Sequence, residues 1–179
     1  MKPEPIYKQI LGTASPDLCP ELAEFHYGSG ARRFRGYCTI EPARSLLTKC
    51  LCFLGGLPVR AAQGEFTFEL IQAAGSEHWT RYFPNGTMRT VLTIRDGRLA
   101  ERFGFTTLTY TLSHEQGKLS MHLRDIALLG IRLPRRWLPI IAATERGENG
   151  RFFFDVGASW GIFGQLARYS GWLDVGRQP

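Results

Sequence analysis

The sequence predicts a mainly β protein (α+β), an antiparallel up-and-down β-barrel of about ten strands with N-terminal helices and a helix at about 42–54. Three observations predict this fold class. Short segments between residues 64 and 175 alternate apolar and polar residues, as half-buried strands do. Gly, Asn and Pro separate these segments, and Asn85-Gly86 and Asp96-Gly97 are strong hairpin signals. Successive hairpins form a meander, and its closure into a barrel removes the exposed edges.

The N-terminal part of the chain predicts two helices and one strand. Residues 6–11 are a short apolar segment that favours a helix. Ser15-Pro16-Asp17 is a typical helix start, and residues 16–27 then carry apolar side chains at helical spacing. Residues 33–40 alternate and predict the first strand.

A further helix is predicted at about 42–54, where apolar residues cover one broad face before Gly55-Gly56 ends the segment. Such a helix either covers the core or forms a lid over the barrel mouth, and the sequence does not distinguish the two.

The remaining strands follow one another through short turns, at residues 65–72, 77–83, 87–95, 98–103, 106–114, 118–128, 138–146, 150–159 and 165–175. An early strand, a helix and a long meander resemble the architecture of the calycins and the small intracellular lipid-binding barrels.

Size and charge limit the kind of protein. The 179 residues are predicted to form a single domain, 1–179. The net charge of +6 permits anionic partners, but the basic residues are spread along the chain and no nucleic-acid partner is predicted. The N-terminus lacks the pattern of a signal peptide, and no segment is long and apolar enough to be an integral membrane span. We therefore expect a cytoplasmic protein.

The sequence predicts no metal site, no cofactor and no catalytic residue. Cys50 and Cys52 are separated by one residue, which fits neither a zinc site nor a redox motif. The four histidines lack metal-ligand spacing, and no nucleophile elbow, P-loop or dinucleotide fingerprint occurs. We expect the cysteines to be reduced packing residues.

The strand at residues 77–83 is the most unusual one, because its alternation places charged and aromatic side chains on one face. Glu77, Trp79, Arg81 and Phe83 share that face. If the face points inward, the buried charges need partners, and Arg81 is suited to bind a ligand carboxylate. The alternative is that Glu77 and Arg81 pair with neighbouring strands on the solvent side.

Two further carboxylates lie on apolar strand faces. Glu101 shares its face with Phe103, and Glu145 repeats the pattern on a later strand. We expect Arg81 to pair with Glu101, and the carboxylates to form a polar patch inside the barrel. Paired acids can also perform general acid–base chemistry, although structural ion pairs are the commoner explanation.

The segment at residues 128–139 combines apolar residues with three arginines and Trp137. It is interpreted as a rigid connection whose leucines plug one end of the barrel. The alternative is a loop that docks on an anionic membrane surface or on a partner domain.

The order of motifs from Tyr7 to Leu173 resembles the bacterial domain of unknown function 4166 family. The motifs are Gly36, Gly55-Gly-Leu-Pro58, Glu77-x-Trp79-x-Arg81-x-Phe83, Glu101-x-Phe103-Gly104, Leu129-Gly-Ile-x-Leu-Pro134, Glu145, Gly150-Arg-Phe152-x-Phe154-Asp-Val156 and Tyr169-x-Gly171-Trp-Leu173. One departure is Ser159-Trp160-Gly161-Ile162, where the family usually has a proline before Gly164. The resemblance implies a module that stands alone or follows saccharopine-dehydrogenase-like oxidoreductase domains, and it implies no catalytic residues.

Three functions are consistent with the sequence. The first is a binding module that holds a hydrophobic, lipid-like or amphiphilic small molecule in the barrel. The second is an isomerase- or cyclase-like enzyme with a buried carboxylate as base, and the third is an interaction domain for an oxidoreductase. We favour the first, with these ligand-binding residues: Glu77, Trp79, Arg81, Glu101, Phe103 and Glu145.

Overall fold

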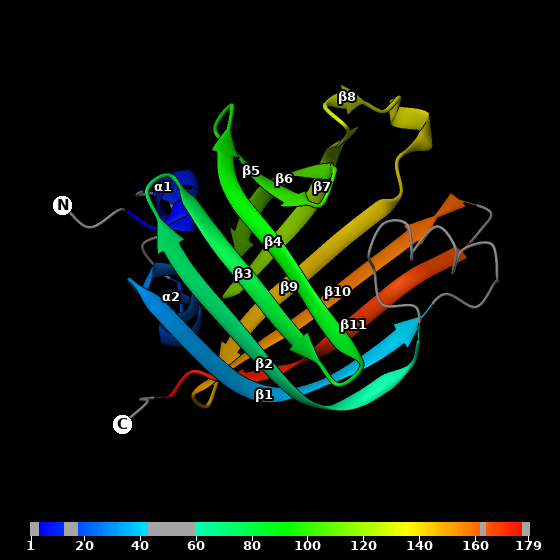
Figure 1. The fold of residues 1–179 in the computed structure, drawn as a ribbon. Coiled ribbons are helices and arrows are strands. Elements are labelled where there is room, and N and C mark those ends of the chain that lie inside the picture. The colour runs from blue at the N-terminus through cyan, green and yellow to red at the C-terminus, as the bar shows by residue number, and fades with distance from the viewer. Residues whose placement is uncertain (1–3, 13–17, 43–59, 162–163, 177–179) are drawn as a thin grey trace.

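Antiparallel strands close into a barrel in the computed structural model, which describes residues 4–12, 18–42, 60–161 and 164–176 (Figure 1). The strands in these ranges are β1 (Ala31–Pro42), β2 (Ala62–Ala73), β3 (Ser76–Phe83), β4 (Gly86–Arg95), β5 (Arg98–Phe103), β6 (Thr106–Glu115), β7 (Lys118–Leu128), β8 (Ile131–Arg132), β9 (Ile140–Glu148), β10 (Arg151–Trp160) and β11 (Gly164–Asp174). The helices are α1 (Ile6–Leu11), α2 (Pro20–Tyr27) and the short 3-10 helix η2 (Arg135–Trp137).

The strand order is that of an up-and-down meander, and this confirms the predicted fold class. Each strand pairs with the next along the chain, while β8 pairs only with β7 and leaves β7 free to pair with β9. The pairing of β1 with β11 closes the ring, so that ten strands form the wall and β8 is an appendage.

The two predicted hairpin signals form tight turns of different kinds. Asp96 and Gly97 both have positive φ, 51° and 69°, as a mirror-image turn requires. Phe83 pairs directly with Gly86, so that Pro84 and Asn85 occupy the two corners, and neither has a positive φ. The predicted hairpin is therefore confirmed, but its corners are Pro84 and Asn85, because the proline ring locks φ near about −65° at the first corner.

The helices α1 and α2 lie against one end of the barrel, which we call the closed end (Figure 1). The α2 side chains Leu22, Phe25 and His26 are buried, and the Phe25 ring stacks on Phe152 of β10 with centroids 4.0 Å apart. The described chain begins and finishes at this same end, since α1 lies here and the amide of Gly176 donates to the Gly150 carbonyl in the β9–β10 turn.

The start of α2 corrects the prediction of a helix over residues 16–27. The helix begins at Pro20, and Cys19 before it has an extended ψ of 154°. A proline disfavours helical backbone in the residue that precedes it, so the helix cannot extend upstream through Cys19. The predicted Ser15-Pro16-Asp17 start and the helix predicted at about 42–54 lie outside the described residues, apart from Pro42, which is the last residue of β1.

The segment 128–139 contradicts the predicted plug for Leu128 and Leu129, which are exposed, whereas Leu133 and Leu138 are partly buried and the prediction stands untested for them. Leu128 pairs with Ile131 and Ala127 with Arg132, so that β7 and β8 continue as a two-stranded ribbon beyond the wall. The side chains of Leu128, Leu129 and Ile131 consequently point into solvent and not across the opening. In Figure 1 this ribbon lies at the end opposite the helices.

Candidate functional site

The inward face of β3 carries the residues on which the predicted site depends. Glu77, Trp79, Arg81 and Phe83 are all buried, and the residues between them are more exposed. The alternation expected from the sequence is therefore present, with the charged and aromatic face inside the barrel.

Arg81 pairs with Glu101 in the middle of the barrel. Its Nη2 donates to Glu101 Oε1 at 3.1 Å, and its Nη1 donates to Thr90 Oγ1 at 3.0 Å. The guanidinium also lies 5.1 Å from the ring centroid of Trp79 and 5.3 Å from that of Phe68, within the range of cation–π interactions. The ion pair expected between Arg81 and Glu101 is present through Nη2, while Nη1 is engaged by Thr90.

Two tyrosines share the mid-barrel environment of this pair. Burial lowers the pKa of Arg81, but Tyr169 and Glu101 raise it, and the net direction is upward. Burial raises the pKa of Tyr169 to about 12, and burial together with Glu101 raises the pKa of Tyr110 well above its ordinary value. The phenols are therefore neutral donors at physiological pH, next to a compensated ion pair.

Glu77 fastens α1 to the barrel. Its Oε1 accepts from the backbone N–H of Ile6, the first residue of α1, at 3.0 Å, and its Oε2 accepts from Trp79 Nε1 at 3.1 Å. Gln72 Nε2 donates to the same Oε1 at 3.5 Å. This carboxylate is occupied by structural partners and belongs to the closed end.

Glu145 fastens α2 in a similar way. Its Oε2 lies 2.7 Å from Nε2 of the fully buried His26, while Nδ1 of that ring has no hydrogen-bond partner. The His26 ring stacks on Tyr7 of α1 with centroids 3.8 Å apart, and the Tyr7 hydroxyl donates to Met121 Sδ at 3.2 Å. Sequence reasoning did not select His26, because Glu145 is 119 positions away and no local motif indicates the contact.

The predicted site residues therefore fall into two groups. Trp79, Arg81 and Glu101 come together in mid-barrel, and Phe103 lies further along β5 from Glu101 on the same inward face. Glu77 and Glu145 lie nearer the helices with Ile6 and His26 as partners, but Trp79 joins Glu77 to the group around Arg81, and all three carboxylates raise the pKa of Tyr7. The ligand-binding role of all six residues stays a prediction.

On β7 and β10 the inward side chains are least buried between the two ends of the strand. On β7 they change from 0% exposed at Leu119 to 8% at Met121 and to the partly buried Leu123, and Ile126 beyond them is again only 8% exposed. On β10 the same change runs from Phe152 to the partly exposed Val156, and Ala158 beyond it is again only 8% exposed. We call the half of the interior lined by the partly exposed Phe103, Leu108, Leu123, Ile141, Val156 and Tyr169 the open half.

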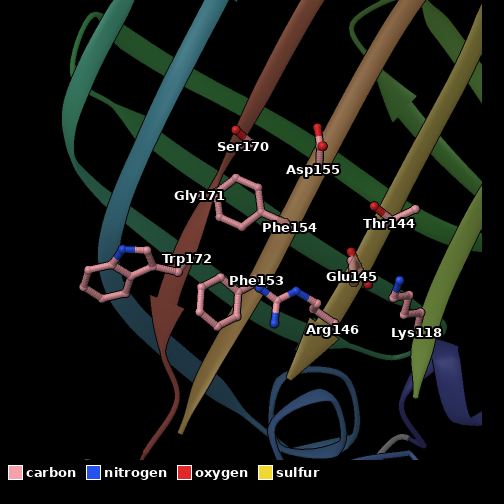
Figure 2. A pocket seen from close by; sticks show the side chains of 10 residues that line it. All are labelled: Lys118, Thr144, Glu145, Arg146, Phe153, Phe154, Asp155, Ser170, Gly171 and Trp172. Atoms are coloured by element: carbon pink, nitrogen blue, oxygen red, sulfur yellow. The ribbon is translucent and has the colours of Figure 1, made fainter. Parts of the chain in front are cut away.

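The outer wall carries a separate hollow of about 440 Å³ across β7, β9, β10 and β11 (Figure 2). Arg146 lies over the Phe153 ring at 4.2 Å, and Arg151 lies over the Trp172 ring at 4.0 Å. Acidic residues compensate two of the arginines on this wall, since Arg146 pairs with Glu148 and Arg168 with Asp155. The hollow thus combines aromatic side chains with largely paired charge.

Other kinds of site lack support within the described ranges. These residues contain no cluster of three metal-ligating side chains. Burial raises the pKa of the Cys38 thiol to about 11, which makes it unreactive at neutral pH. None of the described helices has the length and hydropathy needed to cross a membrane.

Comparison with known proteins provides a family and two distant structural likenesses. A family model described as a domain of unknown function, DUF4166, matches residues 18–173. No curated protein matches the chain. The crystal structure of apo lipid binding protein 8 from Caenorhabditis elegans is 13% identical, with a TM-score of 0.40, and the match covers 78% of this chain and 91% of that one. The crystal structure of Rv2717c from M. tuberculosis is also 13% identical, with a TM-score of 0.45 and coverage of 91% and 100%. Function must therefore be argued from the geometry of this chain.

Proposed function

The chain belongs to the DUF4166 family of domains of unknown function, and from that premise we propose that it binds a lipid-like small molecule in the open half of the barrel. The observation that carries the proposal is the partial exposure of inward apolar side chains on β7 and β10, at positions with buried neighbours on either side along each strand. Apolar side chains such as Leu123 and Val156 remain partly exposed on an inner wall, where burial by an apolar ligand would be favourable.

The mid-barrel ion pair supports a ligand whose polar end is neutral. Glu101 already compensates the charge of Arg81, so an added carboxylate would meet no unpaired cation there. A hydroxyl or carbonyl group can exchange hydrogen bonds with the pair, with Thr90 and with the Tyr169 phenol without adding charge. We therefore propose a long-chain alcohol or a similar neutral amphiphile as the ligand class, in place of an acid gripped by Arg81.

The two other functions remain proposals with less support. An enzymatic base must reach its substrate, and both Glu77 and Glu145 are buried behind structural partners. Glu101, whose side chain is 14% exposed, is the carboxylate among the three that such a reaction would use. An oxidoreductase partner rests on the family resemblance alone.

Binding of an apolar fluorescent probe tests the proposal. We expect saturable binding near one probe per chain. Leu123→Trp should weaken it several-fold with a modest loss of stability, because the new ring enters the open half. Leu70→Trp is the matched control, since Leu70 is fully buried in the closed half and overpacking there should cost about 1–3 kcal/mol. Absence of saturable binding, together with strong destabilisation by Leu123→Trp, would favour a filled interaction domain.

Displacement of the probe tests the nature of the polar end. A long-chain alcohol should displace the probe at a lower concentration than the fatty acid of the same chain length. Stronger displacement by the acid would instead support a carboxylate bound by Arg81.

A further inference from the structure

Large apolar side chains gather on the surface at the end of the barrel opposite the helices. Phe105 is 78% exposed and Leu129 70% exposed, and Leu128, Ile131, Trp137 and Ile140 are exposed as well. They belong to the β5–β6 turn, to the β7–β8 ribbon, to the connection after it and, for Ile140, to the first position of β9. We call these six side chains the rim patch.

The two turn tips of the rim patch lie next to each other. The backbone N–H of Leu129 donates to the carbonyl of Phe105 at 2.9 Å, which joins the β7–β8 turn to the β5–β6 turn. Each tip thus presents a large apolar side chain to solvent, and the hydrogen bond fixes the two in register.

The backbone of Leu129 adds a second observation. Its φ is 50°, in the left-handed region that favours Gly, Asn and Asp. The other described non-glycine residues with positive φ are Asp96, Gln116 and Asn149, which are all polar and all occupy hairpin corners. A leucine at this position strains the backbone of the turn and exposes an apolar side chain to water. The stability of the fold therefore does not explain why a leucine occupies position 129.

The charged residues of the segment that carries most of the rim patch all have one sign. Arg132, Arg135 and Arg136 are exposed in the same segment, and no acidic residue occurs between Asp125 and Glu145. The Arg136 guanidinium lies 5.8 Å from the Trp137 ring centroid. Arginines beside Trp, Phe and Leu are the composition that binds the interface of an anionic bilayer.

We propose that the rim patch docks on an anionic phospholipid membrane. The apolar turn tips enter the boundary between head groups and acyl chains, and the three arginines contact lipid phosphates. The end of the barrel opposite the helices then faces the bilayer. This inference rests on the exposed side chains and their charge, and it holds whether or not the interior takes up a ligand.

Vesicle sedimentation tests the docking. The full chain should bind vesicles of phosphatidylcholine with phosphatidylglycerol more tightly than vesicles of phosphatidylcholine alone, and added salt should weaken binding. Leu129→Asn should reduce binding several-fold while thermal stability stays equal or rises, because asparagine suits the left-handed corner. Loss of folding then cannot explain the loss of binding.

Charge reversal separates a local effect from net charge. Arg135→Glu with Arg136→Glu should weaken binding about tenfold or more. Arg95→Glu with Arg98→Glu gives the same net charge, but these arginines are exposed in the β4–β5 hairpin at the closed end, so binding should change little. The emission of Trp137 should shift to the blue on binding, and Trp137→Phe should abolish that shift while most binding remains.

Three results would overturn the inference: equal binding to both kinds of vesicle, equal effects of the two double reversals, or unchanged binding by Leu129→Asn. A rim patch that instead receives an acidic protein partner would produce the first of these results, because the chain would then bind neither kind of vesicle.

Discussion

At the scale of single residues, the buried Arg81–Glu101 ion pair is the main interaction whose stability needs an explanation. Arg81 is only 5% exposed, and removal of two charges from water costs several kcal/mol per ion before their attraction offsets it. The pair is stable because Thr90 and the faces of Trp79 and Phe68 complete the surroundings of the guanidinium.

We predict that Arg81→Ala lowers the free energy of unfolding by about 3–5 kcal/mol, because it leaves the Glu101 carboxylate unpaired. Arg98→Ala in the exposed β4–β5 hairpin should cost less than about 0.5 kcal/mol. Replacement of both partners, Arg81→Met with Glu101→Leu, should recover most of the loss. Urea denaturation measures all three, and equal midpoints for the Arg81 and Arg98 variants would contradict a buried pair.

Alternation along the strands was sufficient to predict the inward position of Arg81 and Glu101, and their pairing across the intervening strand β4. It was not sufficient for Glu77 and Glu145, whose partners Ile6 and His26 come from helices far away in sequence. A strand pattern tells which face a side chain occupies, but not which distant element packs against that face.

At the scale of elements, the contact between β1 and β11 closes the barrel through two glycines. A Cβ atom on Gly36 would lie 1.8 Å from the Trp172 carbonyl oxygen, and one on Gly171 would lie 2.1 Å from the Tyr37 carbonyl oxygen. These strands approach so closely that neither position accepts a side chain, which gives a physical reason for both glycines in the family pattern.

Alanine at either position should therefore separate the two strands. We expect Gly36→Ala and Gly171→Ala to destabilise by more than about 2 kcal/mol, or roughly 4–8 °C in melting temperature. Gly157→Ala on β10 is the control, because its Cβ would meet nothing within 4 Å, and it should be neutral or stabilising by up to about 1 kcal/mol. Similar melting temperatures for all three variants would show that the closing contact tolerates a side chain.

The elements themselves were largely predictable, because hairpins are local and glycine turns mark their limits. The errors occurred where tertiary contacts decide. The ribbon of β7 and β8 extends beyond the wall and exposes Leu128 and Leu129, two of the leucines that were expected to plug the barrel. No local pattern distinguishes an apolar loop that covers an opening from one that projects beyond it.

At the scale of the whole molecule, buried phenols on three separate elements connect stability to alkaline pH. Burial raises the pKa of Tyr7 on α1 and of Tyr110 on β6 well above the ordinary value, and that of Tyr169 on β11 to about 12. A raised tyrosine pKa means that the fold favours the neutral phenol. The resulting contribution to the free energy of unfolding is complete below about pH 10 and is lost as pH rises through the pKa of the folded state.

Stability should consequently fall between about pH 10 and 12. The phenolate absorbance of these three tyrosines should rise together with the loss of near-ultraviolet circular dichroism, because they ionise as the barrel opens. Tyr169→Phe should make the decline with pH less steep. Complete ionisation near pH 10 with an intact dichroism spectrum would contradict the burial of these phenols.

The position of the chain ends has a mechanical consequence. Because the described chain begins and finishes at the closed end, a domain or tag joined at either side is tethered behind the barrel. The point at which such a domain or tag is attached lies at the end of the barrel opposite the rim patch. A domain joined at either side should therefore leave the rim patch accessible.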